Sequence, residues 1–273
     1  MSGKQLFGMY RAVVEDAVDP EKRGRVRVRI WGLHTDKKTK SATEGIPSNE
    51  LPWAEACLPI HEGAITGFGI FGVPLQGSHV MVFFEAGNLD QPRYFASLPG
   101  LPTAAVDKTK GFNDPAGVYP KNERLNEPDY HRLARGVTDK TLVETKKSNA
   151  AKAVVTATGE TWNEPELYGA QYPHNLVIAT HGGVVLEMDS TPGANRLHLY
   201  HPSHTFIEIG HDGDMIIRNQ KNRYNIVLGS SNSHVKGNDN MTADENINIF
   251  AGTDVNIKAT GNVNIEGGTV NIN

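Results

Sequence analysis

Two pairs of carboxylates could be named as candidates for glycoside hydrolysis. A glycoside hydrolase uses one carboxyl group as an acid and a second as a base or nucleophile, on either side of the bond that breaks. Such a pair must flank a substrate cleft, and nothing in the neighbouring sequence specifies one. We therefore predict no catalytic residue, and a cell-wall hydrolase stays open as an alternative. The candidate pairs are Glu62 with Glu85 and Asp212 with Asp214.

His201 and His204 stand three residues apart, a spacing that suits two metal ligands on a helix or turn. A metal site needs further ligands, and no matching carboxylate or histidine cluster lies at ligand spacing. Cys57 is the only cysteine, so neither an intrachain disulfide nor a multi-cysteine metal site can form. We predict no metal and no cofactor.

The glycines Gly67, Gly69 and Gly72 match the dinucleotide-binding pattern GxGxxG. That pattern works where a strand leads into it and a helix follows to hold the pyrophosphate. Val73 and Pro74 follow here, and they cannot begin such a helix. We predict a loop between two strands.

Five short segments with strand patterns precede residue 100. In residues 25–31 arginines alternate with apolar residues, which places Val26, Val28 and Ile30 on a core face and the arginines on the other. Loops rich in Gly and Pro separate the segments, and no helical period is present. Five such strands favour a small Greek-key barrel such as an OB-fold. The predicted strands are residues 6–14, 25–31, 53–58, 79–84 and 93–98.

The arginine-rich strand raises single-stranded nucleic acid as an alternative partner. OB-folds that bind single strands combine a positive groove with aromatic side chains that stack on bases. Here 27 Lys and Arg stand against 31 Asp and Glu, and the net charge of −4 opposes binding of a polyanion. We therefore favour an arginine stripe that is solvated or faces a protein partner, and we predict no nucleic-acid partner.

The length of 273 residues suggests one to three domains. The first residues lack the charged region and apolar core of a signal peptide, and no stretch approaches 18 apolar residues. We predict that the chain is neither exported through a signal peptide nor inserted as a transmembrane helix.

Residues 100–172 change in character. Pro, Asn, Asp and Lys accumulate and apolar residues become sparse, although residues 141–158 could hold one short helix. A stretch of this length is too long for a free linker in a compact protein. We expect an extended connector that wraps along neighbouring subunits.

An apolar-Asn-apolar unit recurs near the C-terminus, with offsets of 8, 8 and 7 residues. Because side chains in a strand alternate faces, each unit presents two apolar residues to one side and one Asn to the other. The period is typical of a β-solenoid. The eight apolar residues, the predicted needle core, are Ile247, Ile249, Val255, Ile257, Val263, Ile265, Val270 and Ile272.

A single chain with repeats this short cannot form a closed core and would leave strand edges unpaired. We therefore expect several chains to wind together. A disordered, Asn-rich tail is the alternative, but disorder does not require β-branched residues in phase.

Short strands separated by turns are also predicted over residues 173–210. The segments GVVLEMDSTPGANR at 183–196, HPSHTFIEIG at 201–210 and DGD at 212–214 resemble the start of the needle in central spikes of contractile-tail phages. GMYRAVVED at 8–16 and DPEKRGRV at 19–26 resemble the OB-fold domain of those spikes, and EPDYHRL at 127–133 extends the likeness. The valine-glycine repeat spike of type VI secretion is similar.

The resemblance implies an all-β homotrimer in a phage tail baseplate, with a hub protein above the collar and a needle that pierces the host outer membrane. It divides the chain into an OB-fold collar, residues 1–99, an extended connector, residues 100–172, and a triple-stranded β-helix needle, residues 173–273. Some spikes of this family carry a lysozyme domain or a His-x-His iron site near the tip. We expect neither here.

The last repeat predicts a blunt, apolar tip formed by Val270, Ile272 and Asn273. Unpaired edges and apolar residues at such an end favour aggregation. We expect a separate small tip protein, similar to the proline-alanine-alanine-arginine repeat proteins, to cap it. A frayed, hydrated end is the alternative.

Overall fold

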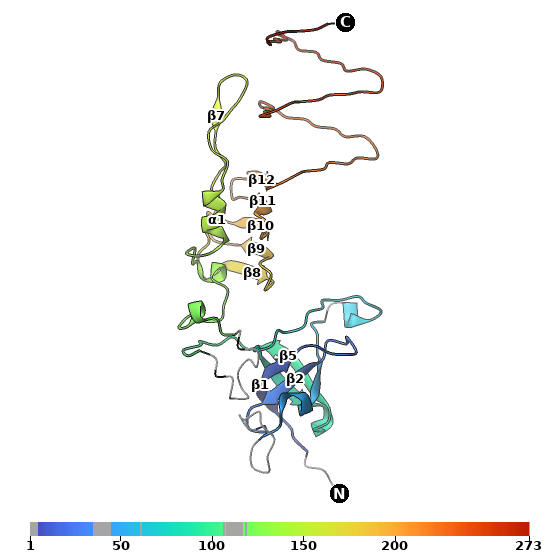
Figure 1. Ribbon diagram of the computed structural model, residues 1–273, viewed down its shortest axis with the longest axis vertical. Helices are drawn as coiled ribbons and strands as arrows, with labels where there is room; N and C mark the ends of the chain where they lie inside the picture. The colour runs from blue at the N-terminus through green and yellow to red at the C-terminus, as the bar shows by residue number, and fades with distance from the viewer. Residues whose placement is uncertain are drawn as a thin grey trace. The chain divides into compact units, whose positions relative to one another are not determined.

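The computed structural model describes residues 5–34, 45–60, 62–105, 107, 117 and 119–272. The chain divides into two compact units, Met1–Arg135 and Gly136–Asn273, which are described separately (Figure 1).

A closed five-stranded barrel forms the first unit, in the order β1-β2-β3-β5-β4. Neighbouring strands are antiparallel except for β3 and β5, which are parallel. The five strands predicted from the sequence are confirmed, with small shifts at their ends. They are β1 (Met9–Asp16), β2 (Val26–Ile30), β3 (Trp53–Ala56), β4 (His79–Phe84) and β5 (Pro92–Ser97).

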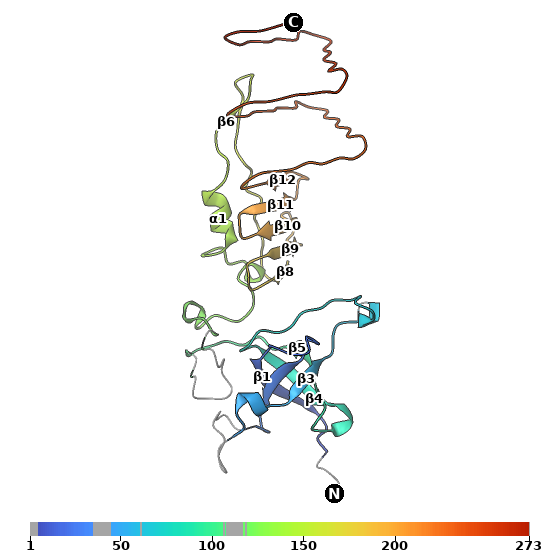
Figure 2. The ribbon, with the colours of Figure 1, turned by 45° about the vertical axis from the view of Figure 1, so that its right-hand side comes forward.

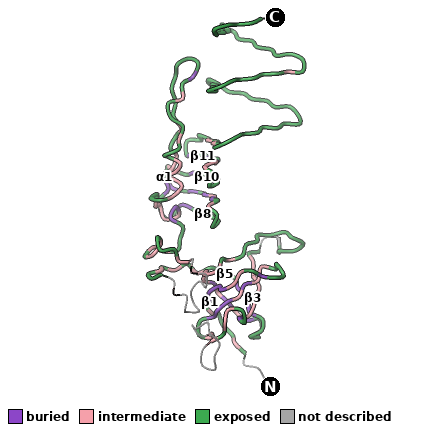
Figure 3. Tube along the Cα trace, viewed as in Figure 1, coloured by how far each residue is buried: buried purple, intermediate pink, exposed green. Residues whose placement is uncertain are grey.

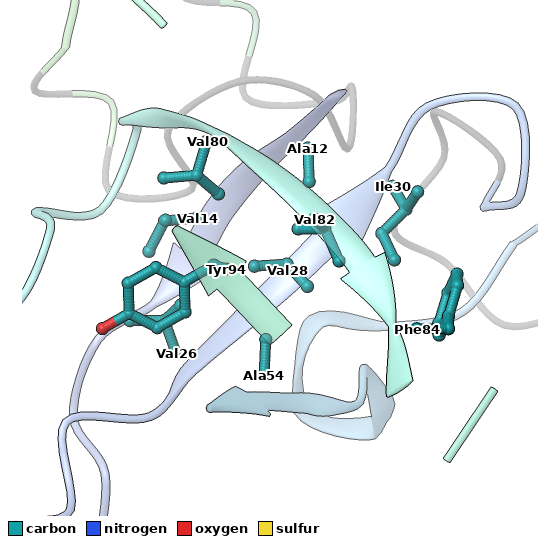
Figure 4. Packing of buried hydrophobic residues seen from close by; sticks show 10 residues of the cluster. All are labelled: Ala12, Val14, Val26, Val28, Ile30, Ala54, Val80, Val82, Phe84 and Tyr94. Atoms are coloured by element: carbon teal, nitrogen blue, oxygen red, sulfur yellow. The ribbon is translucent and has the colours of Figure 1, made fainter. Parts of the chain in front are cut away.

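Alternating apolar residues of the strands fill the barrel interior (Figure 4). In β4, for example, Val80, Val82 and Phe84 point inward and the residues between them are half-buried. Because side chains alternate between the two faces of a strand, each strand contributes every second residue to this interior. The core residues are Ala12, Val14, Val26, Val28, Ile30, Ala54, Val80, Val82, Phe84 and Tyr94.

The arginines of β2 and its preceding turn do not form a solvated stripe. Arg29 is fully buried and makes a bidentate ion pair with Glu15, with Nε–Oε1 and Nη2–Oε2 distances of 2.8 and 3.0 Å. Arg25 pairs with Asp19 at 2.7 Å. The prediction of a solvated or partner-facing stripe is therefore wrong for Arg29, because its own chain covers the outer side of β2: the carbonyl of Ile46 accepts from Arg29.

The loops of this unit contain short 3-10 helices. One of them, η2, lies in the long connection between β3 and β4. They are η1 (Ser48–Glu50), η2 (Glu62–Ala64), η3 (Glu85–Gly87), η4 (Asn122–Arg124) and η5 (Leu133–Arg135).

The second unit contains one helix, a small hairpin and a five-stranded antiparallel sheet. The helix α1 (Leu142–Ser148) confirms the short helix predicted in residues 141–158, and the Thr141 hydroxyl caps it by accepting from the Val143 N–H. The hairpin pairs β6 (Val154–Val155) with β7 (Thr161–Trp162).

The sheet is a meander in which each strand pairs with the next along the chain, in the order β12-β11-β10-β9-β8. Figures 1 and 2 both show α1 beside this sheet. The strands predicted over residues 173–210 are confirmed, and a fifth strand follows them. They are β8 (Asn175–Ala179), β9 (Val185–Asp189), β10 (Arg196–His201), β11 (Thr205–Ile209) and β12 (Met215–Arg218).

Residues 219–272 run as an extended trace that contains neither helix nor strand. Figure 3 shows them exposed almost throughout. The predicted β-helix therefore stays a prediction. Within the described part of the chain, no helix has the length and apolar character needed to cross a membrane.

Candidate functional site

The sheet formed by β8–β12 has its faces reversed relative to an ordinary half-buried sheet. An antiparallel sheet usually packs an apolar face on the core and turns a polar face to water. Here the charged face is covered and the aliphatic face is open. This reversal makes the sheet the candidate functional site of the chain.

The covered face carries a cluster of ionisable side chains, Glu187, Arg196, His198 and Glu208, none more than 4% exposed. Arg196 bridges the two glutamates, with Nη2–Oε1 of Glu187 at 2.8 Å and Nη1–Oε1 of Glu208 at 2.7 Å. His198 lies opposite both glutamates in the strand register, and its Nδ1 is 2.8 Å from Oε2 of Glu187. We call these four residues and Lys146 the polar layer.

Helix α1 and the segment after it cover the polar layer. Lys146, on α1, forms an ion pair with Glu208. Arg218 at the end of β12 donates to the carbonyls of Lys146 and Asn149 and pairs with Glu164 at 3.0 Å. These contacts attach the connector to the back of the sheet.

Burial and charge together set the ionisation of the layer. Burial alone would raise the pKa of Glu187, but the hydrogen bond from His198 and the charge of Arg196 lower this pKa to about 2. Burial lowers the pKa of His198, and the hydrogen bond to Glu187 only partly offsets this effect. Burial also lowers the pKa of Lys146, and the charge of Glu208 partly offsets this effect. At neutral pH the guanidinium of Arg196 therefore lies between two carboxylates, beside a neutral histidine.

The open side of the sheet is aliphatic. Strand pairing places its residues in adjacent columns: Leu197 lies opposite both Met188 and Ile209, and Ile207 lies opposite both Leu199 and Ile217. We call this side the apolar face. Its exposed members, each 36–56% accessible, are Leu176, Ile178, Met188, Leu197, Leu199, Ile207, Ile209, Met215 and Ile217.

The apolar face is too large for a solvent-exposed surface of a stable monomer. Its nine residues expose on the order of 800 Å², whereas the largest apolar patch of a typical monomer is roughly 300–600 Å². The same area is about what one partner buries in a standard protein interface, roughly 800 Å². The arrangement can therefore bind another apolar surface of similar extent.

The predicted needle-core residues are not brought together within one chain. The least exposed is Val270 at 48% and the most exposed is Ile272 at 89%. Of the predicted tip residues, Asn273 lies outside the described residues. The eight core residues are Ile247, Ile249, Val255, Ile257, Val263, Ile265, Val270 and Ile272, all exposed.

The candidate chemical residues serve local structure. Glu85 accepts a hydrogen bond from Arg93 at 2.8 Å. Nδ1 of His201 lies 2.8 Å from the Ser203 hydroxyl, and Nδ1 of His204 lies 2.8 Å from the Tyr200 hydroxyl. No group of three or more His, Cys, Asp or Glu residues within the described ranges could hold a metal ion.

The remaining candidate carboxylates are Asp212, Asp214 and Glu62. Asp212 and Asp214 lie exposed in the turn between β11 and β12. The side chain of Glu62 is outside the described residues.

Sequence reasoning missed the polar layer and the apolar face. The signal was present in β10, RLHLYH, and in β11, TFIEI, where polar or aromatic residues alternate with Leu or Ile. Either set could face a core, and only the position of α1 identifies the covered side.

Known proteins resemble most of this chain. A family model described as the Gp5 N-terminal OB domain matches residues 32–175. Protein Gp5 of Vibrio phage KVP40 is 33% identical over 267 residues, which cover 86% of this chain and 63% of the relative. The pre-baseplate central spike protein Gp5 of Enterobacteria phage T4 is 36% identical over 114 residues, 41% of this chain and 20% of the relative. The chain thus spans less than two thirds of the length of either relative.

Proposed function

Since this chain belongs to the phage Gp5 family, which includes a central spike protein of the pre-baseplate, we propose that it is a central spike of a phage tail baseplate. In this proposal three copies form a needle that punctures the host cell envelope. The protein acts in the virion, after assembly in the host cytoplasm.

The observation that carries the proposal is the apolar face, open on a sheet whose charged face is covered. Burying nine aliphatic side chains is favourable by roughly 25 cal/mol for each Å² removed from water. In an ordinary sheet the charged face would be solvated and the chain's own helix would cover the aliphatic face. Because α1 already covers the polar layer, the apolar face is left for other chains.

Three apolar faces turned toward a common axis would give a closed prism without exposed aliphatic surface. Residues 246–272 would continue the same arrangement with one or two apolar residues from each chain at every level. The outward residues Asn248, Asn256, Asn264 and Asn271 would keep the needle soluble. The number three is inferred from the family resemblance.

A prism of this kind would be stiff. Strands pair within each chain in β8–β12 and would pair between chains in residues 246–272, so bending would require several hydrogen bonds to break and Ile and Val to become exposed together. The attached connector would cover the outer side of each sheet with polar residues, which offers little apolar surface to a membrane. Both properties suit a shaft that passes through an outer membrane transiently.

Two further partners belong to the proposal. A baseplate hub protein would sit on the OB-fold collar. A small tip protein would cover the needle end formed by Val270, Ile272 and Asn273, and the exposure of Val270 and Ile272 supports an apolar cap.

We propose a mechanical role without catalysis. Of the candidate carboxylates, Glu85 forms an ion pair with Arg93. A turbidity assay on purified peptidoglycan distinguishes this role from a cell-wall hydrolase, because only the hydrolase clears the suspension.

Light scattering of the full chain tests the assembly. We expect the mass of three chains and, because intertwined strands separate slowly, resistance to detergent without heating. A stable monomer with a native β-sheet signal would overturn the proposed function.

A further inference from the structure

An uncharged apolar segment extends from the barrel between β3 and β4. Residues 63–75, here called the arm, include four glycines and no ionisable side chain. Figures 1 and 2 both show the η2 turn well away from the barrel strands. The large apolar residues of the arm are exposed: Ile65 by 65%, Phe68 by 58%, Ile70 by 53%, Phe71 by 56%, Val73 by 47% and Leu75 by 37%.

The exposed area of the arm is that of a binding surface. These six residues together expose on the order of 600 Å², most of the roughly 800 Å² that each partner contributes to a standard interface. Since the arm has no charge, a partner gains nothing there from a charged surface and must itself be apolar.

The backbone of the arm is strained at positions that its own unit does not enclose. Ala64 and Thr66 have φ angles of 48° and 51°, in the left-handed region that a β-branched residue such as threonine rarely adopts. Such conformations persist where surrounding structure holds them. The hydrogen bonds at the return to β4 come after the arm, from Gly77 N–H to the Val14 carbonyl and from Gln76 Nε2 to the Glu15 carbonyl.

The outside of the same barrel offers a matching surface across β1, β4 and β5. Met9 pairs directly with Phe83 in the strand register, and the rings of Phe83 and Phe95 meet edge to face at 6.0 Å. Met9 is 67% and Phe95 40% exposed. We call Met9, Met81, Phe83 and Phe95 the Met-Phe patch. Methionine side chains adapt to irregular apolar partners, as a glycine-rich arm would require.

We propose that the arm of one protomer lies on the Met-Phe patch of a neighbouring protomer. Both surfaces are apolar and present on every chain. Among the described residues, the large apolar residues of the arm and the side chains of Met9 and Phe95 are exposed, while Met81 and Phe83 are half-buried. A contact between different patches on identical chains closes into a ring when the rotation is threefold. The binding partner of the arm is therefore a second copy of this chain. This inference rests on the trimer of the proposed function.

Cross-linking between two differently tagged full-length chains tests this contact. In a Cys57→Ser background, one chain carries Phe71→Cys in the arm and the other carries Phe95→Cys in the patch. After coexpression and treatment with a short bismaleimide, we expect a covalent adduct between the two tags. The matched control replaces Phe95→Cys by Val18→Cys, which is 82% exposed but outside the patch, and should give no adduct.

The outcomes separate the contact from the trimer. A particle with the mass of three chains and no adduct, also with Ile70→Cys as the arm position, would overturn the arm contact and leave the proposed function standing. A monomer would overturn both proposals.

Discussion

The barrel and the sheet of β8–β12 differ in how they treat the apolar residues of their strands. Val82 of the barrel is completely buried by its own chain, whereas Leu199 of the sheet is 50% exposed although both lie in regular strands. A closed barrel has no free edge and encloses its apolar residues, while an open sheet can cover only one side with its own helix. The difference indicates that the barrel encloses its apolar residues with its own strands, whereas the apolar face stays open for the partner chains that we propose.

The largest effect is expected when a charge is placed on the apolar face, which tests whether this face is buried between chains. Leu199→Asp should prevent assembly, because three carboxylates would have to lose water and approach one another, at a cost of several kcal/mol per trimer. Light scattering would show monomers with an intact barrel. Leu199→Met, which conserves volume, should cost less than about 1.5 kcal/mol and keep three chains together. A normal trimer from Leu199→Asp would place the apolar face outside the interface.

The needle repeats permit a similar contrast within three residues of sequence. Ile257→Asp should lower the thermal midpoint strongly, since it adds a carboxylate to each chain in a narrow apolar core, again at several kcal/mol per trimer. Asn256→Asp should be far milder because Asn256 is expected to face water. Equal shifts in the two melting curves would show that the inward and outward phases were assigned wrongly.

Val82→Ala tests whether the barrel core is complete within one chain. Removing two buried methyl groups and leaving a cavity should destabilise the barrel by about 2 kcal/mol. The loss should not depend on protein concentration, because the core belongs to one chain. Urea unfolding at two concentrations measures this, and a midpoint that moves with concentration would mean that the barrel core is completed by another copy.

The smallest expected effect is a pH dependence of the polar layer. The pKa of His198 is lower in the folded chain than its usual 6.5, so the unfolded chain binds more protons as the pH falls below about 6.5, and stability falls with it. Below about 4.5 the lowered pKa values of Glu187 and Glu208 add a second loss with the same sign. Hydrogen exchange of the β10 amides, corrected for intrinsic rates, reports both steps.

His198→Gln is the matched control for the first step. Glutamine can still donate a hydrogen bond to Glu187 but does not titrate, so the loss near pH 6 should diminish while the loss below pH 4.5 remains. The Nε2 atom of His198 is buried without a hydrogen-bond partner among the described residues, which is why a second proton there is unfavourable. An unchanged profile in the variant would assign the step to another group.

The barrel could be predicted from sequence because its signal is local. The alternation in β2 and β4 specifies both the strands and the inward residues, and Val26, Val28 and Ile30 lie in the core as expected. The same alternation placed Arg29 on the outer face of β2 correctly. It could not show that the segment containing Ile46 folds over this face and buries the arginine with Glu15.

The faces of the second sheet were harder to predict for a different reason. In β10, Leu197 and Leu199 alternate with Arg196, His198 and Tyr200, so strand parity gives two sets but not the set that its own chain covers. That choice depends on Lys146, some fifty residues earlier, which pairs with Glu208. The proposed needle core stays a prediction, because a core shared by several chains would form no contacts within one chain.

The meander order of β8–β12 also bears on how proteins of this kind change in length. Each strand is joined to the next by a short turn and stacks beside it at about 4.8 Å. An insertion or deletion of one hairpin therefore adds or removes two strands, about 10 Å along the stacking direction. Because the two strands are antiparallel, the chain leaves the hairpin in the direction in which it entered. Evolution can adjust the reach of such a sheet in discrete increments while every remaining residue keeps its face.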